Sequence, residues 1–204
     1  MNTSDIPKVS VIIPVCNQRN TKKIIEELLR QKEEYPSTEI ICVENGSTED
    51  MSFLDAYDIV LRHTDPPGVS RARNLGLDIA QGDYFCFIDN DDWIPPYYLK
   101  VVHERIKSGM DWYIWQWYSD QTFADMKGLD INDPLKQQWA LWGYCWNRHM
   151  FDGVRFDHKD IGGDLKVFDI ITKETKGEFI ETPMYYYWFN GNDESISHKK
   201  NRQT

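Results

Sequence analysis

Residues 68–93 read GVSRARNLGLDIAQGDYFCFIDNDDW, and this stretch gives the strongest indication of the fold. Apolar residues over 69–81 recur at the spacing of one helix face, which predicts an amphipathic helix. The apolar run YFCFI at 84–88 is typical of a strand buried on both faces. That strand leads directly into the acidic segment DNDD at 89–92. A helix, a buried strand and a polar loop in this order form one unit of an α/β fold.

The segments before this stretch show the same alternation. Strands are predicted over 9–15 (VSVIIPV), 39–43 (EIICV) and 59–61, and a helix is predicted over 21–34. Strands that alternate with helices through short connections form parallel sheets with right-handed crossovers. The first half of the chain therefore predicts an open, mostly parallel α/β sheet.

The second half has a different composition, because seven of the eight Trp residues lie between positions 93 and 146. Most of these aromatic side chains are expected to pack the second half, since each buries a large area. The predicted elements are helices over 95–108 and 161–173, and strands over 111–118 and 185–189. The change near residue 95 divides a single domain over 1–204 into two halves, 1–94 and 95–204.

The overall charge excludes some classes of partner. The 204 residues include 23 Lys and Arg against 33 Asp and Glu, so the net charge is -10. A surface this acidic argues against broad binding to nucleic acid, which requires a basic face. No run approaches the roughly 20 apolar residues that span a bilayer. The first residues also lack a signal-peptide pattern. We therefore expect a cytoplasmic protein without an integral membrane segment.

Three polar segments follow predicted strands, at 16–17, 44–47 and 89–92. In open α/β sheets, ligands bind beyond the carboxyl ends of the strands, so these segments should converge on one site. Neither a GxGxxG segment nor a GxxxxGK[ST] segment is present, which removes the two common nucleotide-binding loops.

The acidic segment 89–92 is a candidate metal site. Several carboxylates on one tight loop repel one another unless a cation lies among them, and hard oxygen ligands favour Mg²⁺ or Mn²⁺. The alternative is an acidic turn that caps the helix expected near Pro95. Arg73 could contact a phosphate group, or it could be a solvated helix arginine.

Several segments, in this order, resemble the family 2 glycosyltransferases. They are VSVIIPVCN, EIICVENGSTED, residues 68–93, WNRHMF…VRF, IGGDLKVF and PMYYYWFN…SISH. The resemblance covers Lys8 to about His198. It implies the GT-A fold, with a Rossmann-like central sheet flanked by helices and a smaller aromatic-rich acceptor lobe. Residues 1–94 would bind a nucleotide-sugar, and residues 95–204 would bind the acceptor.

The resemblance implies a set of nucleotide-binding positions: Pro14, Val15, Cys16, Asn17, Glu44, Asn45, Arg73, Asp89 and Asn90. The sequence departs from the family at three of them. An aromatic residue usually stands where this chain has Cys16, and two aspartates usually stand at Glu44 and Asn45. A carboxylate there commonly receives the N3–H of uracil, so these departures bear on which base is bound.

The resemblance also implies the metal ligands. Asp89 and Asp91 match the family's DxD motif, with Asp89 near the ribose and Asp91 on a Mn²⁺ or Mg²⁺ ion that bridges the diphosphate. His198 is a candidate third ligand, and the alternative is an exposed histidine in a terminal tail.

By the same resemblance, Asp164 is the general base. The family usually has Glu before it, whereas this chain has Gly163. A carboxylate at a helix N-terminus has a lowered pKa, which keeps it ionised and able to accept a proton. The alternatives are an ordinary first-turn aspartate, or Asp160 as the base. Trp93 and Gly163 are expected to border the acceptor.

The expected activity is an inverting, metal-dependent transfer of a sugar from a nucleotide-diphosphate donor, with UDP as the favoured carrier, to a hydroxyl acceptor. Two alternatives stay open at this point. One is a catalytically inactive homologue that binds a nucleotide-sugar or carbohydrate, and the other is a nucleotidyltransferase.

Overall fold

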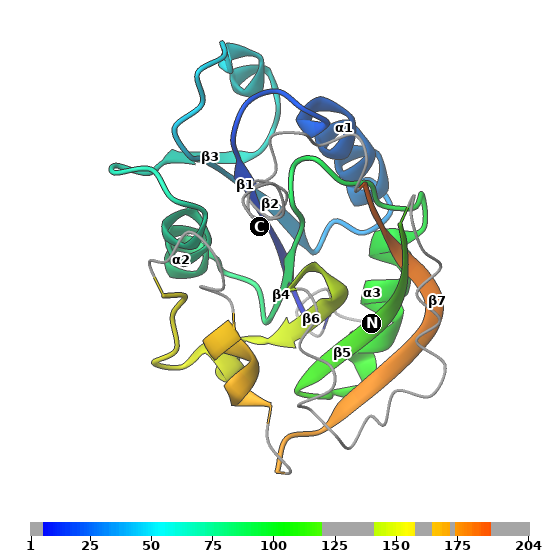
Figure 1. Ribbon diagram of the computed structural model, residues 1–204. Helices are drawn as coiled ribbons and strands as arrows, with labels where there is room; N and C mark the ends of the chain where they lie inside the picture. Colours follow the sequence, from blue (N-terminus) through cyan, green and yellow to red (C-terminus); the bar gives the residue numbers. More distant parts are fainter. Residues whose placement is uncertain (1–5, 120–140, 158–164, 172–173, 189–204) are drawn as a thin grey trace.

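A seven-stranded sheet runs through the computed structural model, which describes residues 6–119, 141–157, 165–171 and 174–188 (Figure 1). The strand order is β3-β2-β1-β4-β6-β5-β7. The strands are β1 (Val9–Val15), β2 (Thr38–Glu44), β3 (Val60–His63), β4 (Tyr84–Phe87), β5 (Trp112–Ser119), β6 (Tyr144–Asn147) and β7 (Gly177–Tyr187). Neighbouring strands are parallel except where β6 pairs with β4 and with β5. The sheet is therefore mostly parallel, as the sequence predicts.

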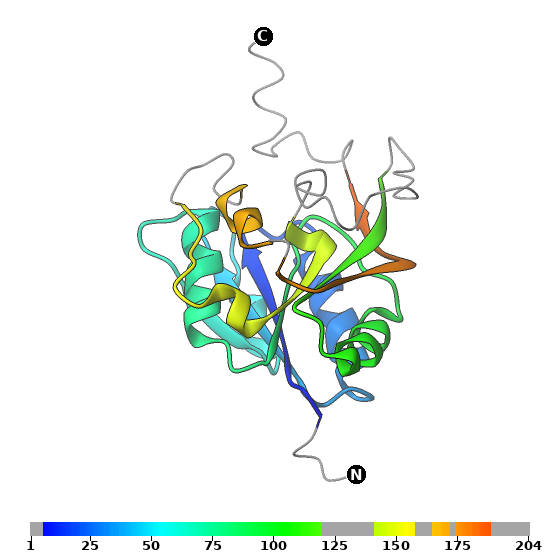
Figure 2. The ribbon, with the colours of Figure 1, turned by 90° about the horizontal axis from the view of Figure 1, so that it is seen from below.

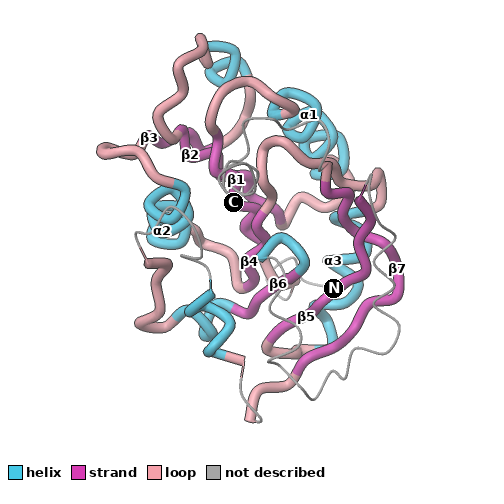
Figure 3. Tube along the Cα trace, viewed as in Figure 1, coloured by secondary structure: helices cyan, strands magenta, loops and turns pink. Residues whose placement is uncertain are grey.

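Helices cover both faces of this sheet. Helices α1 (Thr21–Lys32) and α3 (Tyr98–Arg105) pack on one face, and α2 (Val69–Ile79) packs on the other (Figure 2). The same arrangement is visible along the chain trace, where the strands lie between the two helical layers (Figure 3). This is the three-layer architecture that alternating strands and helices produce.

Strand β1 shows why the buried strands of the first half consist mostly of apolar residues. Val11 and Ile13 point to the layer of α1 and α3, whereas Ile12 points to the layer of α2. All seven residues of β1 are buried. A central parallel strand has no solvated face, so both alternating sets of side chains must be apolar.

The aromatic-rich half extends the same sheet through β5, β6 and β7 rather than forming a separate one. Four tryptophans are buried in it: Trp112, Trp115, Trp142 and Trp146. The prediction that most tryptophans pack the second half is confirmed for these four. Trp142 stacks on Tyr185 of β7, with ring centroids 4.3 Å apart. This contact joins the aromatic core to the strand that carries the candidate site's tyrosine.

The sequence predicts the first half better than the second. Every strand and helix predicted before residue 90 is present, with bounds that shift by a few residues. The predicted helix at 95–108 is α3 followed by a short 3₁₀ turn, Ile106–Ser108. The predicted helix at 161–173 is a 3₁₀ helix over Leu165–Ile170, and residues 161–164 and 172–173 lie outside the described ranges.

Two strands differ from the prediction. Strand β6 has only four residues and was not predicted, because so short an apolar run has no readable period. Strand β7 begins at Gly177 rather than at 185. It contains Pro183, and its register with β5 shifts between Trp115 and Trp117. An edge strand tolerates proline and such an irregularity, and both obscure the alternation that identifies a strand.

The described helices include none that is both long and apolar enough to span a bilayer.

Candidate active site

The acidic loop 89–92 follows β4 at the carboxyl end of the parallel strands, as predicted. Two of its carboxylates form ion pairs with arginines. Arg73 Nη2 lies 2.8 Å from Asp89 Oδ1, and Arg19 Nη1 lies 2.5 Å from Asp91 Oδ2. The side chains of Asp89 and Asp91 are 29% and 19% exposed, so solvent can reach both carboxylates. The loop thus presents two accessible carboxylates, each held by a guanidinium.

Arg73 reaches the loop because α2 packs closely on β1. A Cβ atom at Gly76, one turn after Arg73, would lie 2.4 Å from Ile12 Cγ2. Only glycine therefore allows this approach of helix to strand. Arg73 and Gly76 are both buried on the helix face that meets the sheet.

The Arg73 guanidinium is a buried cation with unused hydrogen-bonding capacity. The residue is 8% exposed, and its Nε has no hydrogen-bond partner within the described residues. Its guanidinium carbon lies 5.8 Å from the centroid of the Phe156 ring. Arg73 is therefore a buried arginine rather than a solvated surface arginine, and a buried N–H group without a partner is costly.

Asn90 connects the acidic loop to the segment after β1. Its side-chain Nδ2 donates to the carbonyl oxygen of Asn17 at 3.0 Å and to Thr21 Oγ1 at 2.8 Å, with a longer contact to the carbonyl oxygen of Cys16 at 3.3 Å. In the opposite direction, the Asn20 N–H donates to the Asn90 carbonyl oxygen at 3.1 Å. Asn90 is 4% exposed, and its side chain holds the two loops together.

Asn17 connects the same segment to the loop after β2. Its backbone N–H donates to Ser47 Oγ at 2.9 Å, and its Oδ1 accepts from the Thr48 N–H at 2.8 Å. Asn17 has a φ of 63°, in the left-handed region where asparagine is well tolerated. The three polar segments expected to converge are therefore joined through the segment after β1.

Glu44, the last residue of β2, is engaged within the protein. Its Oε1 accepts from the Ser47 N–H at 2.5 Å, and its Oε2 lies 3.2 Å from His63 Nδ1. Partial burial raises the pKa of the Glu44 carboxyl, but the hydrogen bonds from Ser47 and His63 outweigh burial and leave the pKa below its usual value. Glu44 is thus ionised near neutral pH and closes the turn after β2. Asn45 Oδ1 accepts from the Gly68 N–H, which ties that turn to the start of α2.

The remaining positions near the end of β1 have different surroundings. Pro14 and Val15 are buried in the strand, whereas Cys16 is partly exposed beyond it. Strand β4 pairs with β1 only as far as Ile12. Pro14 therefore lies beyond the part of β1 that pairs with β4, where the N–H that proline lacks is not needed for the sheet. Of these three, only Cys16 has a side chain that a ligand can reach.

Asp92 differs from the other two carboxylates of the loop in being 1% exposed. Its Oδ2 accepts from the Tyr185 hydroxyl at 2.8 Å, and its Oδ1 accepts from the Trp188 N–H at 3.0 Å. Burial, together with the like charges of Asp91 and Asp89, raises the pKa of Asp92 to about 8. Asp92 therefore fastens the end of β7 to the acidic loop and is unsuited to bind a ligand.

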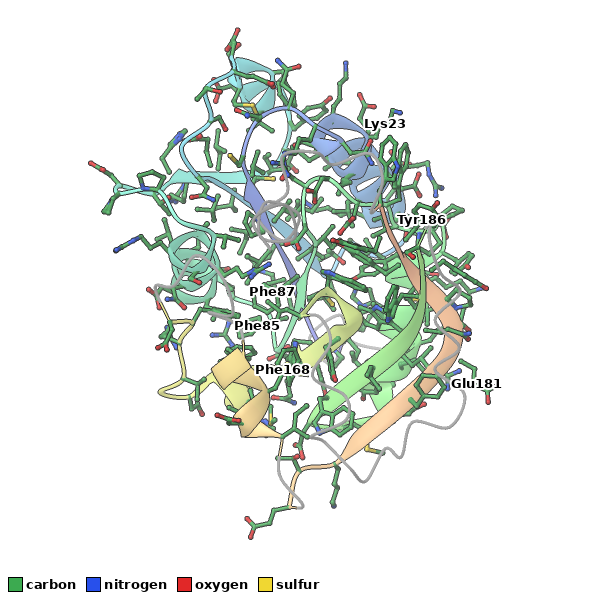
Figure 4. All side chains as sticks on the ribbon, in the orientation of Figure 1. Lys23, Phe85, Phe87, Phe168, Glu181 and Tyr186 are labelled. Atoms are coloured by element: carbon green, nitrogen blue, oxygen red, sulfur yellow. The ribbon has the colours of Figure 1, made fainter. Side chains whose placement is uncertain are left out.

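Trp93 belongs to an exposed aromatic group beside the loop. It forms an antiparallel bridge with Tyr186, and its ring centroid lies 6.1 Å from that of Trp188. Lys23 Nζ lies 4.6 Å from the Trp93 ring centroid. Figure 4 labels Lys23 on α1 and Tyr186 on β7. Tyr186 and Trp188 are 37% and 40% exposed, so this surface can contact another molecule.

Comparison with known proteins identifies the family of the chain. The family model described as Glycosyl transferase family 2 matches residues 10–163. The chain belongs to glycosyl transferase family 2.

Named relatives come from several bacteria. The chain is 33% identical over 215 residues to the putative glycosyltransferase EpsH of Bacillus subtilis, in a match that spans 90% of this chain and 61% of EpsH. It is 27% identical over 192 residues to the glycosyltransferase GlyA of Streptococcus pneumoniae, which spans 77% of this chain and 27% of GlyA. The chain thus covers about a quarter to three fifths of the length of these two relatives.

Solved structures support the fold. Residues 1–349 of Staphylococcus aureus TarS align with a TM-score of 0.77 over 89% of this chain and 60% of that chain, at 17% identity. TarS complexes with UDP and with UDP-GlcNAc align with TM-scores of 0.70 and 0.67, both at 18% identity. These alignments cover 91% and 90% of this chain, and 62% and 59% of those chains. The expected GT-A fold is confirmed, and the chain is a glycosyltransferase domain.

Three expected site residues, Gly163, Asp164 and His198, lie outside the residues that the structure describes. The family model ends at residue 163, directly before Asp164. Their roles as acceptor neighbour, base and metal ligand stay predictions.

The residues of the acidic loop fit the divalent cation that the family resemblance implies. The described residues contain no group of three or more His, Cys, Asp or Glu that could hold a metal ion. They do offer two accessible carboxylates, at Asp89 and Asp91. Mg²⁺ and similar ions commonly bind one or two carboxylates and take their other ligands from water and substrate phosphates. This donor set suits a cation that binds together with a diphosphate.

Sequence reasoning missed three residues of the site: Arg19, Asp92 and Tyr185. Arg19 lies two residues beyond the polar segment 16–17, and the only signal for it is its position after the first strand. Tyr185 lies in the PMYYYWFN segment, but nothing in the sequence distinguishes it from Tyr186 and Tyr187. Asp92 was part of the acidic loop, and only its burial separates its role from that of Asp91.

Proposed function

We propose that this glycosyltransferase moves a sugar from a UDP-sugar to a hydroxyl acceptor with inversion at the anomeric carbon. Residues 1–94 bind the donor and residues 95–204 bind the acceptor. A Mn²⁺ or Mg²⁺ ion is held by Asp91 and Asp89, with His198 as a further ligand, and Asp164 is the general base. We place the activity in the cytoplasm, as the sequence predicts.

The observation that carries this proposal is the pairing of Arg73 with Asp89 at the carboxyl end of β4. The Arg73 guanidinium is nearly buried, and its Nε has no partner among the residues that the structure describes. Beside the accessible Asp89 carboxylate, it provides both signs of charge that a nucleoside diphosphate and its cation require. The carboxyl ends of the strands are also where α/β sheets bind ligands.

UDP is favoured as the carrier because the related fold of TarS has been solved with UDP and with UDP-GlcNAc. Glu44 retains a carboxylate at the position that would receive the uracil N3–H. That carboxylate is ionised, and it accepts from the Ser47 N–H and contacts His63. Each carboxylate oxygen accepts more than one hydrogen bond, so Glu44 can keep these partners and still bind a base.

The proposed sugar transfer requires a base, a group that orients the phosphates and a divalent cation. Asp164 accepts the proton of the acceptor hydroxyl as that oxygen attacks the anomeric carbon. Arg73 orients the donor's phosphates through its buried guanidinium, and Asn90 holds the loops in register. When bound, a divalent cation neutralises charge that grows on the departing diphosphate. A single displacement of this kind inverts the anomeric configuration and needs no covalent intermediate.

The acceptor would lie beside the exposed aromatic group that includes Trp93 and Trp188. Aromatic faces pack against the apolar faces of sugars. The carbonyl and N–H of Trp93 are paired with Tyr186, which fixes its place relative to the acidic loop. A carbohydrate hydroxyl is therefore the favoured acceptor.

The test is release of UDP from a panel of UDP-sugars, with and without Mn²⁺ and with carbohydrate acceptors. The proposal expects Mn²⁺-dependent release that one sugar and one acceptor stimulate. Asp164→Asn should bind UDP normally and lose this turnover, and Asp160→Asn is the matched control. Turnover retained in Asp164→Asn would move the base role to another group.

One alternative is kept, because Cys16, Asn45 and Gly163 depart from the family pattern. It is a catalytically inactive homologue that binds a nucleotide-sugar or carbohydrate. Thermal unfolding with UDP, GDP, CDP, dTDP and ADP, each with and without Mn²⁺, separates the two when combined with the turnover assay. Binding to the folded state raises the melting temperature. A nucleotide-dependent rise without any turnover would support the inactive homologue.

A further inference from the structure

Arg19 is bonded to one oxygen of the carboxylate that is the proposed metal ligand. Its Nη1 lies 2.5 Å from Asp91 Oδ2, which is a short charge-assisted hydrogen bond. The two side chains are 25% and 19% exposed, so the pair is partly shielded from water. Partial shielding strengthens an ion pair relative to one that is fully solvated.

The backbone around Arg19 is held on both sides. On one side, the Gln18 N–H donates to Glu49 Oε2 at 2.7 Å. On the other, Asn20 Nδ2 donates to the Asp92 carbonyl oxygen at 2.6 Å. Arg19 itself has a φ of 36°, in the left-handed region that few arginines adopt. These contacts fix the origin of the side chain beside the acidic loop, so Arg19 can leave Asp91 by side-chain rotation alone.

The Arg19 guanidinium already neutralises the Asp91 carboxylate, and a divalent cation on the same carboxylate would carry a like charge close to it, so each weakens the binding of the other. We propose that Arg19 and the divalent cation bind Asp91 in alternation, so that Arg19 is a built-in competitor of the metal. Arg19 keeps the Asp91 carboxylate ordered and neutralised, and the cation must displace it. This inference rests on the proposed role of Asp91 as a metal ligand.

Competition makes a prediction that a purely supportive role does not. If Arg19 only oriented Asp91 for the metal, its removal would weaken metal binding. If Arg19 competes, its removal strengthens binding of the metal by the free energy of the lost ion pair. For a partly shielded pair this corresponds to a fall of about threefold to fivefold in the Mn²⁺ dissociation constant.

The experiment titrates Mn²⁺ alone into the full chain, without nucleotide, and measures free Mn²⁺ by electron paramagnetic resonance. Arg19→Gln removes the charge and should bind Mn²⁺ about threefold to fivefold more tightly. Arg19→Lys keeps the charge and should bind nearly as the unsubstituted chain does. Arg105→Gln is the matched control, because Arg105 forms a comparable pair with Glu178 at 3.0 Å, away from the acidic loop. It should leave the Mn²⁺ affinity unchanged.

The outcomes separate this inference from the proposed function. Equal or weaker Mn²⁺ binding by Arg19→Gln, with binding lost in Asp91→Asn, overturns the competition while leaving the metal site intact. Mn²⁺ affinity that Asp91→Asn does not change overturns both the competition and the assignment of Asp91. Tighter binding in Arg19→Gln alone, lost again when Asp91→Asn is added, supports the proposal.

Discussion

The Tyr185 hydroxyl donates a 2.8 Å hydrogen bond to the buried Asp92 carboxylate. The same hydroxyl accepts from the Asp89 N–H at 3.0 Å. One side chain of β7 therefore fixes the acidic loop at two points, and the aromatic-rich second half supports the geometry of a loop in the first half.

Substituting Tyr185→Phe removes both of these hydrogen bonds and keeps the ring that stacks on Trp142. We expect the free energy of unfolding to fall by about 1–2 kcal/mol, because a buried carboxylate loses a donor. We also expect UDP to bind several-fold more weakly in the presence of Mn²⁺, since the loop is less well positioned. Urea unfolding and calorimetric titration measure the two effects.

The control for this prediction is Tyr113→Phe. The Tyr113 hydroxyl also takes part in two hydrogen bonds, with the Met110 N–H at 3.0 Å and with Ser108 Oγ at 2.9 Å, away from the acidic loop. It should lose stability without losing UDP affinity. An equal loss of UDP affinity in both variants would show that Tyr185 acts only through general stability.

Arg73→Gln should weaken UDP binding about tenfold or more, because a nearly buried cation next to Asp89 is lost. Calorimetric titration of UDP with Mn²⁺ gives the dissociation constant. Arg155→Gln is the comparison, since Arg155 pairs with Asp78 at the same 2.8 Å distance but on an exposed surface. Similar UDP affinities for the two variants would remove Arg73 from the donor site.

Asn90→Asp should destabilise the protein by about 2–3 kcal/mol or more. The carboxylate would face the carbonyl oxygens of Cys16 and Asn17, where the amide now donates, and unmet or repulsive buried contacts are costly. Asn90→Ala should be less harmful, because it removes the donor without adding a charge. Urea unfolding orders the two variants. Greater stability of Asn90→Asp than of Asn90→Ala would contradict the assigned hydrogen bonds.

His103 makes the stability depend on pH. Burial, and next the charge of Lys107, lower its pKa to about 4, and its Nε2 lies 2.8 Å from Thr38 Oγ1. The folded state therefore keeps His103 neutral while the unfolded chain binds a proton near pH 6.5. The contribution of His103 to the free energy of unfolding is fully present above pH 6.5. It is lost as the pH drops towards 4, with a slope of up to about 1.4 kcal/mol per pH unit.

His103→Gln keeps a hydrogen-bonding side chain and removes this titration. Urea unfolding at pH 7, 6, 5 and 4.5 should show a smaller decline for the variant than for the unsubstituted chain. Parallel declines in the two proteins would mean that another group causes the pH dependence.

The first half of the fold could be predicted because strands β1, β2 and β4 are buried over all or most of their length. Apart from Ser10, strand β1 is apolar, and the apolar residues of the following helix α1 recur with a period of about 3.6 residues. The second half could not be predicted as well. Its short β6 has no readable period, and Pro183 interrupts β7 where an edge strand tolerates it.

The candidate site was partly predictable for a related physical reason. Asp89, Asp91 and Asn17 follow strands of a parallel sheet, so their convergence follows from topology. The roles of Tyr185 and Asp92 depend on which tyrosine of β7 and which aspartate of the acidic loop is buried. The hydrogen bond between these two side chains determines this, and no sequence pattern indicates it. The ion pair between Arg19 and Asp91 joins residues 72 positions apart, and no local pattern indicates such a pair.

The central claim is that the site binds UDP through a divalent cation on Asp91. Calorimetric titration of UDP with and without Mn²⁺, into the unsubstituted chain and into Asp91→Asn, tests it most directly. The account predicts that Mn²⁺ tightens UDP binding at least about tenfold in the unsubstituted chain and has little effect in Asp91→Asn. UDP binding that is absent, or that is the same with and without Mn²⁺, would contradict it.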